Sequence, residues 1–206
     1  MPRLVKLYLT TYFTPALLLL VLTCPLWQVG HLSPVPLMHN TPITDSCVFY
    51  AKSLLWNITD TLKQNNLFNG FTCTEQNVEL NMETRTPSLC APKISACSGV
   101  TESEFDQDSC LTNIGKDLIY YHNFLTAQPD PERLLSPTVL FSLRELMENC
   151  FAWTLSKDVP LQQVTPDRER TYDERLNLCK VLKGFQVRTI TINRAIGYIS
   201  SGEHSS

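Results

Sequence analysis

Residues 178–200 read LCKVLKGFQVRTITINRAIGYIS and contain no proline. Apolar side chains recur along this stretch at steps of three, four and seven residues, which is the spacing of a helix that buries one face in a protein core. The positions on that face are Leu178, Leu182, Phe185, Ile192, Ile196 and Ile199. The stretch predicts a long C-terminal helix that begins either after an Asp167 cap or nearer Thr171.

The opposite side of the same helix is also poor in charge. At about 100° per residue, the side chains that gather there are Val187, Ile190, Thr191, Arg194 and Tyr198, beside the small residue Gly197. A helix that is apolar on two sides is expected to be buried on both. Either a long connection covers this second side, or it is a subunit interface in which Arg194 enters a pocket on a partner.

Three further helices are predicted upstream, because each long proline-free segment carries a helical stripe of apolar residues. The stripes are Cys47, Ala51, Leu54, Ile58 and Leu62; Leu111, Ile114, Leu118, Tyr121 and Leu125; and Leu143, Leu146, Cys150 and Trp153. No stretch shows a convincing strand alternation. Four amphipathic helices favour an all-α four-helix bundle.

The connections between these helices differ in length. The first spans about residues 67–108 and holds three cysteines, whereas the second is short, around residues 128–136. A long first crossover is typical of an up-up-down-down, long-chain bundle of the cytokine kind rather than of a simple up-down bundle. We therefore expect such a bundle, with disulfides bracing the first crossover loop.

The N-terminus indicates export from the cell. Residues 1–30 contain Arg3 and Lys6, no acid, and a short apolar block at 16–22, which favours a cleaved secretory signal peptide over a membrane anchor. Residues 31–206 would form one secreted, extracellular domain, with no membrane insertion after cleavage. The net charge of −3 argues against nucleic acid as a partner.

Eight cysteines in 206 residues point to disulfide bonds, and removing residues 1–30 leaves seven. A zinc site is a poor alternative, because no Cys-x-x-Cys motif occurs and histidines are few. One of the seven must stay free or bond to another chain.

We expect no enzymatic activity, no metal and no cofactor, because no nucleophile–base pair or ligand cluster is visible. Asn57-Ile58-Thr59 is the one N-glycosylation sequon.

The last-helix motif LC-x-x-L-x-x-F-x-x-R-x-x-TI-x-R-x-x-x-Y resembles the interleukin-12 alpha-chain family. Upstream, the segments at 71–74 (FTCT), 117–121 (DLIYY) and 145–147 (ELM) are similar to the first-loop cysteine segment and to the second and third helices of that family. The resemblance implies a secreted cytokine subunit that pairs with a soluble-receptor-like beta subunit. It also implies signalling through a two-chain receptor that drives interferon-gamma responses.

The same resemblance implies roles for single residues. Arg194 matches the arginine that the family inserts into a beta-subunit pocket, and it selects the interface interpretation for the residues around it. Tyr172 lies where the family places an aromatic receptor contact, although it is equally well placed to pack against the start of the last helix.

The family pattern also implies a disulfide map, in which Cys73 pairs with Cys179, Cys90 with Cys110 and Cys47 with Cys97. Cys150 would be left over, and its place on the third helical stripe favours a buried free thiol. The first-loop cysteine that bonds to the beta subunit in the family's familiar members has no counterpart in the short segment between Cys90 and Cys97. Alternatively the pairing is wrong and Cys97 is the interchain residue.

Two other functions fit a secreted helical bundle. One is a hormone-like cytokine that acts alone, and the other is a disulfide-braced carrier that holds a small apolar ligand in an internal void. Secretion of the chain with and without a beta-type subunit distinguishes them from a subunit that needs its partner.

Overall fold

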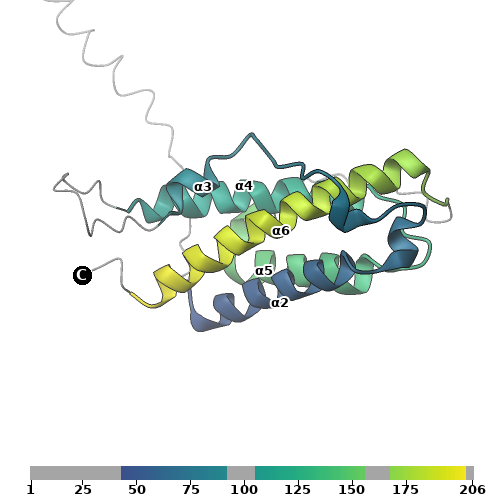
Figure 1. Cartoon of the computed structure of the whole chain (residues 1–206). Coiled ribbons are helices and arrows are strands. Elements are labelled where there is room, and N and C mark those ends of the chain that lie inside the picture. Colours follow the sequence, from purple (N-terminus) through teal and green to yellow (C-terminus); the bar gives the residue numbers. More distant parts are fainter. Residues whose placement is uncertain (1–42, 92–104, 156–167, 203–206) are drawn as a thin grey trace, which may run out of the picture. The chain divides into compact units, whose positions relative to one another are not determined.

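The computed structural model describes residues 43–91, 105–155 and 168–202 of the chain, and within these ranges all regular structure is helical (Figure 1). The main helices are α2 (Asp45–Thr61), α4 (Gln107–Thr126), α5 (Phe141–Cys150) and α6 (Tyr172–Ser200). Short elements lie between them: η1 (Asn65–Phe68), η2 (Cys73–Glu75), α3 (Thr86–Leu89), η3 (Ser136–Leu140) and η4 (Ala152–Thr154). The predicted all-α bundle is confirmed.

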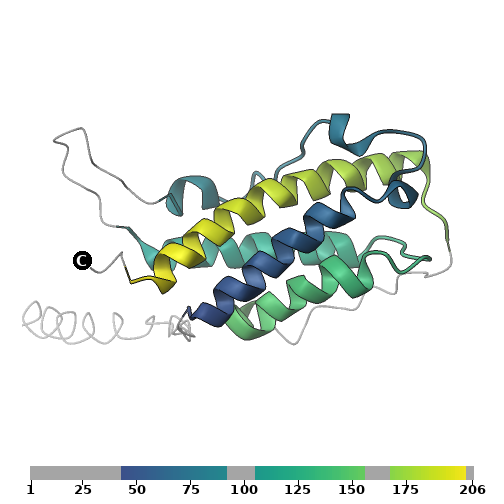
Figure 2. The same ribbon diagram turned by 60° about the horizontal axis from the view of Figure 1, so that its bottom comes forward.

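The helix directions follow from contacts between distant parts of the chain. The contacts are Ala51–Asn193 and Thr59–Gln186 between α2 and α6, Asp117–Arg188 and Tyr121–Phe185 between α4 and α6, and Cys47–Cys150 and Asn57–Thr138 between α2 and α5. In each pair one residue number rises while the other falls, so the two helices are antiparallel. Hence α2 and α4 run one way and α5 and α6 the other, which fits the expected up-up-down-down order (Figure 2).

The predicted apolar stripes form one core. All six core positions of the last helix are buried, and so are the stripe residues of α2 from Cys47 to Leu62. At the centre, the rings of Tyr121 and Phe185 stack with their centroids 4.1 Å apart. Burial of this apolar surface is the main term that stabilises the bundle.

Side-chain caps fix where the helices begin. Helix α6 starts at Tyr172 with a capping box in which Thr171 and Glu174 bond to each other's backbone N–H groups. This resolves the two predicted starts in favour of the later one. Asp106 caps α4 through the Ser109 N–H. Asp130 accepts hydrogen bonds from three successive backbone N–H groups, those of residues 134–136, just before α5.

The disulfides correct one part of the predicted map. The structure contains the two expected bonds Cys73–Cys179 and Cys90–Cys110. However, Cys47 bonds to Cys150, so the pairing of Cys47 with Cys97 and the free thiol at Cys150 are wrong. The reason is the antiparallel packing of α2 and α5, which places the start of one beside the end of the other, with 5.8 Å between the two Cα atoms.

The remaining cysteine of the predicted mature chain, Cys97, lies outside the described residues, as do the expected signal peptide and residues 31–42. Among the helices that the structure describes, none combines the length and the apolar character needed to cross a bilayer.

Candidate functional site

The predicted interface residues form a band on the side of α6 that faces away from the core. We call Val187, Ile190, Thr191, Arg194, Gly197 and Tyr198 the outer patch. Val187 is 45% exposed and Ile190 38% exposed, although both are apolar. Arg194 is exposed, and a Cβ placed on Gly197 would meet no heavy atom within 4 Å. The structure therefore brings the patch together as one accessible surface.

Arg194 and Tyr198 differ in what surrounds them. Within the described part of the chain, Arg194 has no hydrogen bond and no ion pair, so its charge is left to solvent or to a partner. Tyr198 is half-buried and packs edge-on against Phe105, with ring centroids 5.2 Å apart. At the C-terminal end of the patch, Tyr198 is therefore held in place by Phe105. One turn earlier, the charged group of Arg194 is available to a partner.

The long first loop lies along the flank of α6, beside the outer patch. The Glu79 N–H donates to the Lys180 carbonyl at 3.1 Å, and Lys183 Nζ donates to the carbonyls of Thr74 and Gln76. The approach is so close that a Cβ on Gly184 would stand 1.8 Å from the Glu79 carbonyl oxygen. In its described part the loop covers this flank and leaves Val187 and Ile190 open.

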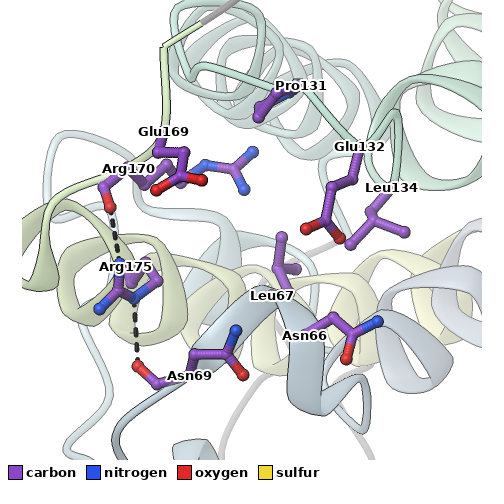
Figure 3. A pocket seen from close by; sticks show the side chains of 9 residues that line it. All are labelled: Asn66, Leu67, Asn69, Pro131, Glu132, Leu134, Glu169, Arg170 and Arg175. Carbon is purple, nitrogen blue, oxygen red and sulfur yellow. Dashed lines mark hydrogen bonds between the residues drawn. The ribbon is translucent and has the colours of Figure 1, made fainter.

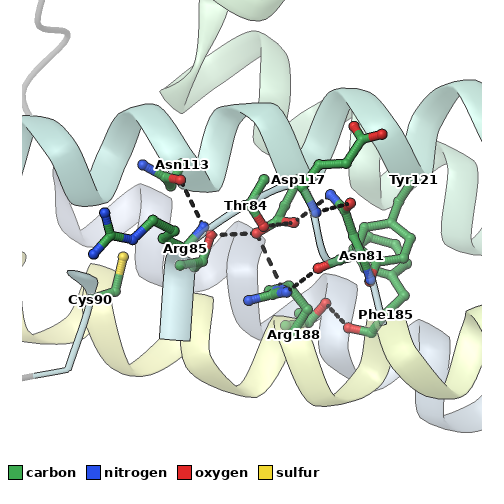
Figure 4. A network of polar contacts seen from close by, with 12 residues as sticks. Asn81, Thr84, Arg85, Cys90, Asn113, Asp117, Tyr121, Phe185 and Arg188 are labelled. Carbon is green, nitrogen blue, oxygen red and sulfur yellow. Dashed lines mark hydrogen bonds and ion pairs between the residues drawn. The ribbon is translucent and has the colours of Figure 1, made fainter. Parts of the chain in front are cut away.

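A buried polar cluster holds the loop in this place (Figure 4). Asp117 of α4 accepts from Asn81 Nδ2 at 2.9 Å, from Thr84 Oγ1 at 2.7 Å and from Thr86 Oγ1 at 2.5 Å. Arg188 of α6 places its Nε 3.3 Å from the same carboxylate and donates through Nη2 to the Asn81 carbonyl at 2.7 Å. The cluster joins two helices and the loop, so it holds the loop beside the patch.

The ring of Tyr121 closes this cluster on its apolar side. Its hydroxyl accepts a hydrogen bond from the Asn81 N–H at 3.4 Å, and burial raises the pKa of Tyr121 to about 12. The phenol therefore stays neutral at physiological pH.

The two arginines of the last-helix motif have different roles. Arg188 is buried and internal, whereas Arg194, six residues later, is exposed. Sequence reasoning overlooked Asp117 and Arg188. A signal was present, because each occupies a position among the core residues of its helix, where a charge needs an opposite partner.

Tyr172 stands at the other end of α6. It is 50% exposed, its ring packs edge-on against Phe71 with 5.6 Å between centroids, and it lies 3.8 Å from the Cβ position of Gly70. One side of the ring therefore packs against the first loop, at Gly70 and Phe71, and the other side is open. Both interpretations of Tyr172 are compatible with this geometry.

A cavity of about 120 Å³ lies near Tyr172, between η1, the α4–α5 connection and the start of α6 (Figure 3). Arg170, Arg175, Glu132 and Glu169 line it together with asparagines and a few apolar residues. The Arg170 side chain is only 8% exposed, and its Nη2 is 3.7 Å from Asp130 Oδ1. Such a charged lining does not suit a small apolar ligand.

The sequon residue Asn57 lies on the side of α2 that faces η3 and α5. It is half-buried, and its Nδ2 donates to the Thr138 carbonyl at 3.5 Å. Thr59 of the sequon bonds elsewhere, since its hydroxyl accepts from Gln186 of α6.

In residues 43–91, 105–155 and 168–202 no group of three or more histidine, cysteine or acidic side chains is placed to hold a metal ion.

The chain is similar to known proteins over most of its length. The family model of the interleukin-12 alpha subunit matches residues 16–202. Similar proteins include interleukin-12 subunit alpha from Lama glama, 26% identical over 218 residues, which covers 88% of this chain and 97% of the relative. The corresponding protein from Capra hircus is 27% identical over 217 residues, and that from Equus caballus is 24% identical over 218, each with the same coverage.

Proposed function

The chain belongs to the interleukin-12 alpha subunit family, and from this premise we propose that it is a secreted cytokine subunit that pairs with a soluble-receptor-like beta subunit. The heterodimer would act through two interleukin-12 receptor chains and promote interferon-gamma-type cellular immunity. Residues 1–30 would serve as the cleaved secretory signal. This family consists of cytokines, so we propose no catalytic role.

The observation that carries the proposal is the outer patch. Two apolar residues, Val187 and Ile190, are exposed within one turn of each other on a helix whose opposite face is the bundle core. Arg194 lies about one turn beyond Ile190 on the same side and has no partner in the described part of the chain. An arginine amid apolar neighbours is the residue type that anchors protein interfaces.

The corrected disulfide map supports a covalent link in the proposed heterodimer. Six of the seven cysteines expected in the mature chain bond within it, which leaves Cys97 of the first loop. The family's familiar members join the beta subunit through a first-loop cysteine. We propose that Cys97 has this role, which restores the interchain alternative that the sequence left open.

Tyr172 is proposed as a receptor contact at the far end of α6. Its open face is held in place by Phe71 on the other side, so little side-chain entropy is lost when a partner covers it. The distance along α6 from Tyr172 to the outer patch leaves room for a receptor chain and a beta subunit on the same helix.

Co-expression with a beta-type chain of the same species tests the proposal. Arg194→Glu should abolish the heterodimer or weaken it by at least about 30-fold, the equivalent of a 2 kcal/mol anchor. Arg144→Glu is the matched control, because Arg144 is an exposed arginine on α5, whose main neighbours are α2 and α4 rather than α6. Equal complex formation by both variants would refute the interface.

The same experiment addresses the other candidate functions. A hormone-like cytokine that acts alone, or a carrier, should be secreted as a monodisperse chain without the beta-type subunit. A subunit with an uncovered patch should be retained or aggregate unless its partner is present. Non-reducing electrophoresis of wild type and Cys97→Ser then reports whether the two chains share a disulfide.

A further inference from the structure

The outward side of α2 and α5 carries large exposed aromatic residues that the proposed heterodimer does not use. Trp56 is 74% exposed and Phe141 is 59% exposed. Each lies two residues, about 200° of helix, from a buried core residue, Ile58 for Trp56 and Leu143 for Phe141. Both side chains therefore point away from the core, where apolar surface of this size needs an explanation.

The two aromatic residues lie at similar heights along the paired helices. Helices α2 and α5 are antiparallel, with Cys47 bonded to Cys150 at one end and Asn57 donating to the Thr138 carbonyl toward the other. Trp56 immediately precedes Asn57, and Phe141 follows Thr138 by three residues in the continuous η3–α5 helix. Asn57 is therefore the neighbour of Trp56 on α2 and contacts the backbone one turn before Phe141 on the facing helix.

The amide of Asn57 is suited to carry a sugar at this position. Its side chain is half-buried, and the bond to Thr138 uses one of the two Nδ2 hydrogens. The other hydrogen remains for the link to N-acetylglucosamine. The sequence places the asparagine in the motif Asn57-Ile58-Thr59, which is the acceptor for N-linked glycosylation in secreted proteins.

We propose that an N-linked glycan on Asn57 packs its first sugars over Trp56 and Phe141 and covers the aromatic surface of α2 and α5. A pyranose ring has an apolar C–H face that buries against an aromatic ring, and its hydroxyls remain in water. Phe141 is less than one turn of helix, about 5.4 Å, beyond Thr138, which two sugars can span. The occupant of this surface is the chain's own glycan rather than a protein.

The glycan would leave the outer patch free. Asn57 faces α5, whereas Thr59 of the same sequon bonds to Gln186 on the α6 side of α2. The inference is therefore independent of the proposed heterodimer and is testable on the chain in whichever form it is secreted.

The experiment uses full-length chain secreted from animal cells, alone or with a beta-type chain. Peptide mapping should show an N-glycan at Asn57 in wild type and Thr59→Ser, which keeps the sequon, and none in Thr59→Ala or Asn57→Gln. Hydroxyl-radical labelling read by mass spectrometry then measures access to each side chain. Labelling of Trp56 and Phe141 should rise at least twofold without the glycan, whereas Met82, exposed on the first loop, should not change.

Enzymatic removal of the glycan from folded wild-type protein is a second test that does not depend on the folding of the variants. It should raise the labelling of Trp56 and Phe141 by the same factor. An unoccupied sequon would overturn the proposal. So would an occupied sequon with equal labelling of Trp56 and Phe141 before and after glycan removal, because the surface would then be open or covered by another protein.

Discussion

Replacing Asp117 by alanine should be among the most destabilising single changes in the bundle. The variant removes the acceptor for three side-chain donors and leaves the Arg188 guanidinium buried without a counter-charge. Breaking a buried pair by removing one partner costs about 3–5 kcal/mol. For a domain of this size that free energy corresponds to a fall in Tm of about 6–20 °C.

A double-mutant cycle separates this electrostatic effect from simple loss of packing. In the Asp117→Ala background the charge on Arg188 is already uncompensated, so Arg188→Met should cost about 1–3 kcal/mol less there than in wild type. Urea unfolding of the dilute, disulfide-intact chain, followed by far-UV circular dichroism, gives the four free energies of unfolding. Additive effects, or a cost below about 1 kcal/mol for Asp117→Ala, would show that the cluster does not hold the loop as the contacts indicate.

Three further predictions concern the loop, the corrected disulfide and a helix cap. Gly184→Ala should displace the first loop and raise amide hydrogen exchange there, whereas Gly197→Ala, with open space around it, should leave exchange unchanged. Cys47→Ser with Cys150→Ser should lower the free energy of unfolding by about 2–5 kcal/mol; peptide maps showing Cys47 joined to another cysteine would contradict the assigned bond. Burial opposes ionisation of Asp130, but hydrogen bonds from residues 134–136 outweigh it and hold its pKa below the ordinary value. The Asp130 cap therefore stabilises the folded state fully at pH values above the unfolded pKa of about 3.9, and this contribution is lost as the pH falls through the lower folded pKa. In Asp130→Ala the free energy of unfolding should consequently fall less steeply with decreasing pH in the acid range than in wild type.

The helices were predictable because each buries one continuous stripe. In α6 the spacing of the apolar residues from Leu178 to Ile199 predicted the core face. The same helical spacing placed Val187, Ile190 and Arg194 together on the other side. These are local periodicities, which depend on neighbouring residues alone. The short α3, by contrast, has four residues, Thr86–Leu89, and too few positions to show a period.

Features that depend on which helices are neighbours could not be read from the chain in the same way. The bond from Cys47 to Cys150 requires α2 and α5 to be adjacent and antiparallel, and the family pattern suggested a different partner. The pair of Asp117 and Arg188 was missed for a similar reason, although a charge at a core position of each helix was visible. The local pattern shows that such a charge needs a partner, but only the packing of the helices shows which residue that partner is.

The two disulfides of the first loop have a consequence for how the chain survives cleavage. Cys73 is tethered to α6 through Cys179, and Cys90 to α4 through Cys110, so the segment between them is fastened at both ends like a strap. Arg85 lies exposed in that segment. If a protease cleaves the backbone there, the bond between Cys73 and Cys179 still joins the two fragments covalently. The fragments separate only when the disulfides are reduced.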